Sequence, residues 1–263
     1  MKYVWVIGAS TGIGEAVALQ YFNLGYQVYI SARTGAKLEQ LAAEHNQYDE
    51  SDGEGMLIPI EMDVTDEFSV GSAVQRIQDI HGRLHKVIVN AGTCEYIDDT
   101  QVDLELVKRV MDTNLYGAMR VSNYVQPLLD HDEASQLVFI SSSVTYQALP
   151  RAHAYGGSKA ALRYFAQCLK MDIQHEGVDV RVVSPGFVKT PLTDKNDFDM
   201  PFMISSEDAA NRIVKGLEGS NFDIHFPKRF TYTLKLFSLL PNAIKFYLLG
   251  KVSRTNSDSI KDA

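Results

Sequence analysis

Two residues able to exchange a proton stand four positions apart in the stretch YGGSK, Tyr155 and Lys159. On a helix this spacing places both side chains on one face, where an ammonium favours the phenolate form of a tyrosine. The pattern alone has little weight, because 13 tyrosines in 263 residues give about one Tyr-x-x-x-Lys by chance. A second copy, Tyr247 and Lys251 in YLLGK, makes the same point. The surrounding elements must decide which pair can do chemistry.

A glycine-rich turn, GASTGIG at 8–14, follows the first apolar run of the chain. Glycines allow close approach of the backbone, and the free amides of a helix N-terminus bind a pyrophosphate. The spacing Gly-x-x-x-Gly-x-Gly differs from the usual Gly-x-Gly-x-x-Gly of dinucleotide-binding folds. A purely structural turn is the alternative, but the position between a strand and a helix favours a nucleotide site.

The end of the second apolar run predicts which dinucleotide binds. NAD is favoured by a carboxylate that binds the ribose hydroxyls, but this chain has Ala32 followed by Arg33. A guanidinium pairs with a 2′-phosphate as a charge-assisted fork. An exposed loop arginine is the alternative. We therefore predict NADP (NADPH) as the cofactor and consider NAD the less favoured choice.

The elements that must position these residues alternate along the chain. Near-continuous apolar runs predict strands at 3–7, 27–31, 56–60, 86–90, 137–141, 180–184 and 222–226. Apolar residues at helical spacing predict helices at about 13–24, 65–80, 104–129 and 155–175. SSED at 205–208 predicts a further helix start capped by Ser205. The pattern indicates a single α/β domain, a Rossmann-like doubly wound parallel sheet with helices on both faces.

Composition excludes several classes of function. A net charge of −8 argues against nucleic acid as a partner. The two cysteines, Cys94 and Cys168, indicate no disulfide framework. His81 and His85 are four apart, but Gly82 interrupts them and no third ligand is near, so we assign no metal. No secretory signal is visible in MKYVWVIGAS, so we expect a soluble, cytoplasmic protein.

Six further motifs follow the glycine turn in a fixed order: MDVTD, VNAG, TNLYG, ISSS, YGGSK and SPGFVKT. Together they resemble the short-chain dehydrogenase/reductase family, over residues 3 to about 226. The chain has Val89 in place of the first asparagine of that family's Asn-Asn-Ala-Gly. Within the family it is similar to the short NADP-type members of roughly 250 residues.

The resemblance implies hydride transfer between the nicotinamide and a carbonyl or alcohol carbon. It selects Tyr155 as the proton donor or acceptor and makes the Tyr247 pair accidental. Lys159 is expected to lower the pKa of Tyr155 and to bind the nicotinamide ribose, and Ser142, thirteen residues before Tyr155, to stabilise the substrate oxygen. Ser143 is a lesser alternative to Ser142. Asn114 is expected to hold a helix backbone position and a water.

The cofactor contacts implied by the same motifs come from the glycine turn, the strand ends and the active-site helix. They are Gly8, Ser10, Thr11, Gly12, Ile13, Gly14, Arg33, Asp63, Val64, Asn90, Ala91, Gly92, Tyr155, Lys159, Pro185, Gly186, Val188 and Thr190. Relatives of this kind imply a homodimer or homotetramer. Two alternatives stay open: a non-catalytic NADP-binding regulator on the same fold, and a nucleotide-sugar epimerase or dehydratase.

Loops after the fourth, fifth and sixth strands are expected to form the substrate pocket. Their side chains are mostly apolar or aromatic, which predicts a lipophilic small-molecule carbonyl or alcohol compound as substrate; a lid over the nicotinamide is the alternative. The candidates are Cys94, Glu95, Tyr96, Val144, Thr145, Tyr146, Leu192, Phe198, Met200, Phe202 and Met203.

The C-terminal segment is the least family-like part. We assign 1–228 to the catalytic domain, 229–252 to an apolar extension and 253–263 to a disordered tail. Lys235, Pro241 and Lys245 interrupt the extension, which argues against a membrane span of about 20 apolar residues. Its stripe comprises Phe230, Leu234, Phe237, Leu240, Phe246 and Leu249. We expect this stripe to pack on protein, as a lid or an interface, although a membrane surface is a further possibility.

Overall fold

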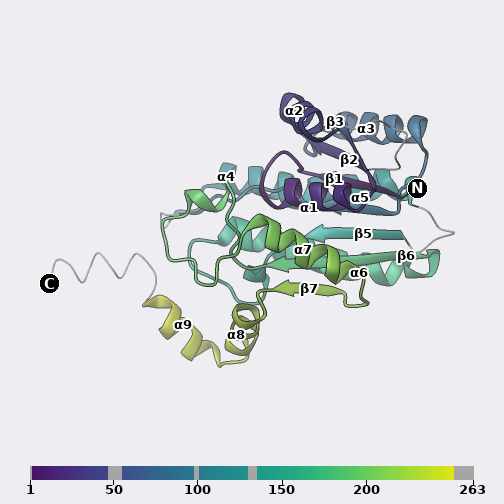
Figure 1. Cartoon of the computed structure of the whole chain (residues 1–263). Helices are drawn as coiled ribbons and strands as arrows, with labels where there is room; N and C mark the ends of the chain where they lie inside the picture. Colours follow the sequence, from purple (N-terminus) through teal and green to yellow (C-terminus); the bar gives the residue numbers. More distant parts are fainter. Residues whose placement is uncertain (1, 47–54, 98–100, 130–134, 252–263) are drawn as a thin grey trace.

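One seven-stranded parallel sheet forms the centre of the computed structural model, which describes residues 2–46, 55–97, 101–129 and 135–251 (Figure 1). Its strands are β1 (Tyr3–Ile7), β2 (Gln27–Ala32), β3 (Met56–Glu61), β4 (Lys86–Val89), β5 (Ser135–Ile140), β6 (Val178–Pro185) and β7 (Asp223–Phe226). The order is β3-β2-β1-β4-β5-β6-β7. The predicted doubly wound fold is confirmed, and the predicted tail 253–263 lies outside the described residues.

The sheet is buried on both faces, as its continuous apolar strands require. Every residue of β1 is buried, and its register pairs Val6 with Ile30 of β2 and with Ile88 of β4. The side chain of Trp5 points to one face and donates a hydrogen bond to the Ser31 hydroxyl at 2.9 Å. This central strand therefore fixes the position of the glycine turn that follows it.

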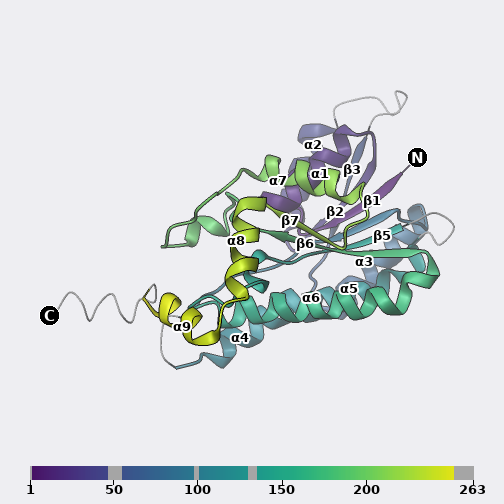
Figure 2. The same ribbon diagram turned by 90° about the horizontal axis from the view of Figure 1, so that it is seen from below.

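Helices cover both faces of the sheet (Figure 2). On one face lie α1 (Gly12–Asn23), α2 (Gly35–His45) and α7 (Ser206–Leu217); on the other lie α3 (Glu67–Ile80), α5 (Gly117–Val125) and α6 (His153–Ile173). The predicted cap of α7 is confirmed, since the Ser205 hydroxyl accepts from the Asp208 amide at 3.1 Å. Helix α2 was not predicted.

The helix predicted over 104–129 is not continuous. It consists of α4 (Leu104–Met111), a π-helical turn η2 (Asp112–Tyr116), α5 and a short 3₁₀ turn η3 (Gln126–Leu128). Single π-helical turns inside helices are frequent at functional sites. The turn η2 contains Asn114, whose side chain makes the contacts described below.

The chain continues beyond β7 into α8 (Lys228–Ser238) and α9 (Asn242–Gly250), which Pro241 separates. Both views place this pair at the β7 edge of the molecule, outside the two helical layers (Figures 1 and 2). Thr231 is the one buried residue of α8, and none of α9 is buried. Within the part of the chain that the structure describes, no helix is long and apolar enough to cross a membrane.

Candidate active site

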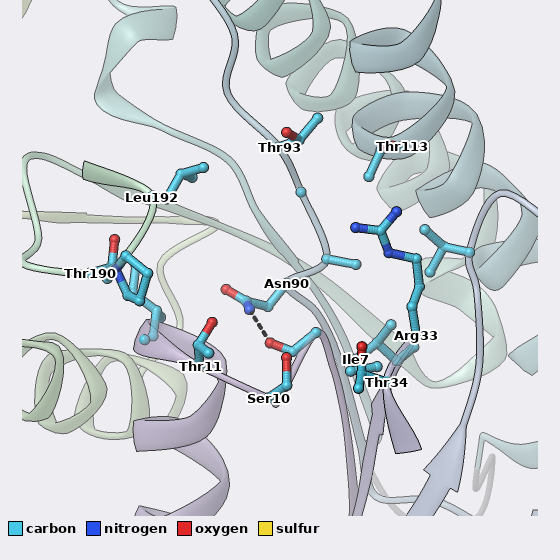
Figure 3. Close-up of a pocket in the computed structure, with 18 of the residues that line it drawn as sticks. Ile7, Ser10, Thr11, Arg33, Thr34, Asn90, Thr93, Thr113, Thr190 and Leu192 are labelled. Atoms are coloured by element: carbon cyan, nitrogen blue, oxygen red, sulfur yellow. Dashed lines mark hydrogen bonds between the residues drawn. The ribbon is translucent and has the colours of Figure 1, made fainter. Parts of the chain in front are cut away.

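A cavity of about 710 Å³ opens at the carboxyl ends of β1, β2 and β4 (Figure 3). The strand order reverses between β1 and β4, which is where doubly wound sheets bind their ligands. Most of the predicted cofactor contacts line this cavity: Gly8, Ser10, Thr11, Gly12, Ile13, Arg33, Asp63, Val64, Asn90, Ala91, Gly92 and Thr190. Sequence motifs and topology thus identify the same region.

The glycine turn leaves no room for side chains. Gly8 has φ +83°, and a Cβ there would lie 2.7 Å from the Ala91 Cα; at Gly14 a Cβ would lie 2.0 Å from the Gly8 carbonyl oxygen. That carbonyl accepts a hydrogen bond from the Asn90 side chain at 2.8 Å (Figure 3). The side chain of Thr11, the N-cap of α1, makes no capping hydrogen bond. The Gly8 and Ala9 amides donate to the Ser31 carbonyl, so the backbone amides left for the cavity are those at the start of α1, which fits a pyrophosphate.

Four cations border this cavity: Arg33, Lys37, Arg109 and Lys195. Arg33 extends across it toward Thr113 (Figure 3). Arg109 pairs with Glu95 at 2.9 Å, whereas Arg33, Lys37 and Lys195 form no ion pair within the described ranges. Lys37 lies on α2 and was missed because that helix was not predicted. The cavity lining is thus positively charged beside the end of β2, where Ala32 supplies no carboxylate.

Tyr155 and Lys159 lie near the start of α6, and Ser142 follows β5. Tyr155 and Ser142 line a second cavity of about 540 Å³, which adjoins the first because Leu192 lines both. The Ser142 hydroxyl oxygen accepts from the Val144 amide at 3.2 Å, and its own proton can be donated to the Tyr155 oxygen. Lys159 is 4% exposed, and its ammonium donates to the Ile140 carbonyl at 2.8 Å.

Burial raises the pKa of Tyr155 to about 12; the Cys94 thiol also raises it, and a hydrogen bond with Ser142 opposes the shift. Burial lowers the pKa of Lys159 to about 8. The expectation that Lys159 lowers the tyrosine pKa is therefore wrong for this structure. The physical reason is that the Lys159 ammonium donates to the main chain of β5 and is itself desolvated.

Asn114 joins the loop after β4 to the active-site helix. It is fully buried; its carbonyl accepts from the Thr93 amide at 2.7 Å, and its amide donates to the Thr93 carbonyl and the Ser158 hydroxyl, each at 2.9 Å. The Ser158 hydroxyl donates to the Tyr155 carbonyl at 2.8 Å. The Asn114 side chain thus holds the loop after β4 directly and reaches the backbone of α6 through Ser158, and the expected water stays a prediction.

The second Tyr-x-x-x-Lys pair has a different environment. Tyr247 is exposed on α9, and the Lys251 ammonium lies 4.2 Å from the centre of its ring.

The two histidines that were considered as metal ligands, His81 and His85, make structural contacts. His81 is hydrogen-bonded to the Tyr29 hydroxyl, and the His85 Nδ1 accepts from the Tyr3 amide at 3.0 Å.

The second cavity is only partly the pocket that was predicted. It is lined by Cys94, Tyr96, Val144, Leu192 and Phe198 from the expected loops, together with Gly186 from the expected cofactor set. Glu95 lines the cofactor cavity instead, and Thr145, Tyr146, Met200, Phe202 and Met203 line neither cavity. The same is true of Gly14, Lys159, Pro185 and Val188 from the cofactor set. These residues pack in the interior or have side chains that point away from both cavities. The Tyr146 hydroxyl, for example, donates to Asp223 at 2.7 Å.

Lining residues that were not predicted as pocket come from three regions. Phe187, Thr193, Asn196, Asp197 and Asp199 follow β6. Ser143, Leu149, Pro150, Arg151 and Ala152 lie between β5 and α6, and Phe230, Leu234 and Leu249 belong to α8 and α9. The apolar stripe of the C-terminal segment was the sequence signal for the group on α8 and α9. The extension therefore contributes walls to the cavity that Tyr155 borders.

Known proteins with this pattern are numerous. Residues 2–200 match the family described as short chain dehydrogenase. An uncharacterized oxidoreductase of Myxococcus xanthus is 32% identical over 240 residues, covering 91% of this chain and 92% of its own. The NADPH-dependent 1-acyldihydroxyacetone phosphate reductase of Schizosaccharomyces pombe is 32% identical over 196 residues, covering 74% of this chain and 62% of its own.

Solved structures agree on the fold. A short chain dehydrogenase of Burkholderia cenocepacia in complex with NADP has a TM-score of 0.79 at 21% identity, covering 95% of this chain and 99% of its own. A short chain dehydrogenase/reductase of Burkholderia phymatum in complex with NAD also has a TM-score of 0.79, at 18% identity, covering 89% of this chain and 92% of its own. The chain belongs to the short-chain dehydrogenase/reductase family and is an oxidoreductase of that family.

Proposed function

We propose that the protein is an NADP(H)-dependent oxidoreductase that transfers a hydride between the nicotinamide and a carbonyl or alcohol carbon of a lipophilic small molecule. The observation that carries the proposal is the position of Tyr155 and Ser142, which border an apolar cavity adjoining the glycine-lined one. A substrate oxygen in the apolar cavity can meet both hydroxyl groups. A non-catalytic NADP-binding regulator would have no use for this arrangement.

When bound, the nicotinamide supplies the hydride for reduction or accepts it in oxidation. Tyr155 holds its proton at neutral pH, because burial raises its pKa to about 12, and gives that proton to the developing alkoxide oxygen. Ser142 donates a hydrogen bond to the same oxygen and stabilises its charge. We therefore assign Tyr155 and Ser142 to the reduction of a carbonyl group, because that direction requires a protonated phenol.

Lys159 and Asn114 position this pair. The buried Lys159 ammonium is fixed by the Ile140 carbonyl, within 3.2 Å of where a Cβ on Gly92 would stand, so it faces the loop after β4. Asn114 fixes the same loop through Thr93 and fixes α6 through Ser158. We assign Lys159 to the nicotinamide ribose and Asn114 to holding the two elements in register.

The preference for NADP(H) rests on this chain's own charges, because solved structures of the fold contain NAD as well as NADP. Arg33 and Lys37 border the cavity beside Ala32, where a carboxylate would select NAD. Both cations suit a 2′-phosphate. The Schizosaccharomyces pombe relative, which is named as NADPH-dependent, is consistent with this preference.

A lipophilic substrate is supported by the walls of the second cavity. Tyr96 and Phe198 meet edge to face with ring centres 5.6 Å apart, and Phe187 meets Phe198 edge to face at 6.0 Å. Apolar pockets of several hundred Å³ with a few polar groups accommodate drug-sized organic molecules. The same relative is named for a substrate with an acyl chain, which is also consistent with such a pocket.

The test follows NADPH oxidation by the purified protein with aldehydes and ketones of increasing chain length. We expect turnover that improves with apolar size, and a loss of about 10²-fold or more in Tyr155→Phe, the usual worth of general acid catalysis. The matched control is Tyr247→Phe, which should keep wild-type turnover, and both variants should bind NADPH normally. Wild-type turnover in Tyr155→Phe, or an equal loss in Tyr247→Phe, would refute the assignment. NADPH binding without turnover on any compound would favour the regulator.

A further inference from the structure

The outer side of α8 and α9 exposes large apolar side chains. They are Tyr232, Leu236, Leu239, Leu240, Ile244, Phe246, Tyr247 and Leu248, with Leu239 79% exposed and Phe246 69% exposed. Here these residues are called the outer face. A group of apolar side chains this large on one small helical pair exceeds what single scattered hydrophobic residues explain. Leu240 and Phe246 of the predicted stripe are exposed in the single chain, so their expected packing on protein, as part of an interface, stays a prediction.

The inner side of the same helices is occupied. Phe230, Leu234 and Leu249 line the apolar cavity, and Phe230 stacks on Phe187 with ring centres 5.4 Å apart. Lys235 fixes the helix to the edge strand through Asp223 at 3.4 Å. The pair is thus held with one apolar side against the catalytic fold and the other directed away from it.

The charge of this segment is opposite to that of the chain. Residues 228–251 contain five basic side chains, Lys228, Arg229, Lys235, Lys245 and Lys251, and no Asp or Glu, in a protein with a net charge of −8. Of these five, only Lys235 has an ion-pair partner among the described residues. Basic residues interleaved with exposed aromatic and leucine side chains are the composition of helices that lie on anionic membrane surfaces.

We propose that the outer face docks on an anionic lipid bilayer, with α8 and α9 lying along the surface of the membrane. Charge argues against a second copy as the occupant. In a twofold interface the same patch meets itself, so the basic residues of both copies would face one another. A bilayer with anionic headgroups neutralises them while its acyl region takes up Leu239 and Phe246.

Docking would also place the mouth of the apolar cavity beside the bilayer, because the same two helices form its wall. A carbonyl compound dissolved in the membrane could then enter without crossing water. This consequence rests on the proposed function, whereas docking itself does not. Docking is therefore tested by binding, with no substrate present.

The experiment is flotation of the full-length protein with vesicles of phosphatidylcholine alone or with about 30% phosphatidylserine, at low and high salt. We expect the protein to float with the anionic vesicles, with affinity about tenfold or more above that for the neutral ones, and to be released by salt. The double variant Leu239→Asn/Phe246→Asn should lose binding by about tenfold or more. The control is Phe68→Asn on α3, because Phe68 is 82% exposed but belongs to neither helix.

Circular dichroism and light scattering accompany the flotation. The double variant should retain the wild-type spectrum, because Leu239 and Phe246 are largely exposed. The proposal is overturned if the wild-type protein stays with the soluble fraction, or if the double variant floats as well as wild type. It is also overturned if the double variant converts an oligomer into monomers while neither form binds vesicles, since a second copy would then cover the outer face.

Discussion

Arg33 should carry the coenzyme preference, and its removal gives the sharpest test of the proposed NADP specificity. The guanidinium extends across the cofactor cavity without an ion-pair partner in the described part of the chain (Figure 3). Arg33→Ala therefore removes a positive charge and leaves no buried carboxylate unpaired. The loss should affect NADPH and spare NADH, which lacks the 2′-phosphate.

The magnitude follows from the exposure of the group. A hydrogen bond to a charged group contributes about 1.5–3 kcal/mol, but Arg33 is exposed, so solvent screening favours the lower end of that range. A loss of about 1.4 kcal/mol is tenfold in the dissociation constant. Lys37, in the first turn of α2, should contribute less, because its ammonium is a flexible point charge. Its removal should raise the NADPH dissociation constant a few-fold, or about 0.2–1 kcal/mol. The double variant should bind NADPH and NADH with similar affinity.

Fluorescence titration of both coenzymes against wild type, Arg33→Ala, Lys37→Ala and the double variant measures these differences. Arg76→Ala is the matched control, because Arg76 is exposed on α3, does not line the cavity and changes the net charge equally. Equal affinity of the wild-type protein for NADPH and NADH would refute the reasoning. So would a loss of NADPH binding in Arg76→Ala as large as in Arg33→Ala, since that would reflect net charge alone.

Two further changes test the elements that support the site. Asn114→Asp keeps the acceptor for the Thr93 amide but loses two donated hydrogen bonds, so the free energy of unfolding by urea should fall by about 1–3 kcal/mol; a variant as stable as wild type would show that these bonds contribute nothing. Burial and the nearby Lys235 and Lys228 lower the pKa of His225 to about 4, so the unfolded chain binds a proton that the folded one does not. The contribution of neutral His225 to the free energy of unfolding should be fully present above about pH 6.5. It should be lost between about pH 6.5 and 4, a decrease of about 2–3 kcal/mol. His225→Gln should remove that part of the decline, and an identical pH dependence in both proteins would contradict the prediction.

The sheet was predictable because its determinants are local. Each strand is a short run of β-branched and apolar residues, and burial on both faces needs no alternation. The glycine turn was predictable for the same reason, since a residue with φ +83° and no room for a Cβ must be glycine whatever surrounds it. Helix α2 was not, because GAKLEQLAAEH offers only Leu38, Leu41 and Ala42 as buried residues. Missing α2 also hid Lys37.

The π-helical turn η2 could not be predicted from the sequence for a different reason. Its wide turn coexists with hydrogen bonds between Asn114 and Thr93, which are 21 residues apart, and between Asn114 and Ser158, which are 44 apart. No local preference of TNLYG distinguishes such a turn from ordinary helix. Sequence order selected Asn114 as a site residue, but only the tertiary structure shows that its amide holds the loop after β4.

The error in the pKa of Tyr155 shows what residue spacing leaves undetermined. Four positions on a helix place Tyr155 and Lys159 on one face, as expected, but do not determine where the ammonium donates. Burial dominates both groups, raising the pKa of the phenol to about 12 and lowering that of the amine to about 8. Near neutral pH the phenol is therefore protonated while the amine still carries its charge. A proton donor held beside a buried cation is suited to an oxygen that gains negative charge, which is the alkoxide formed when hydride reaches a carbonyl carbon.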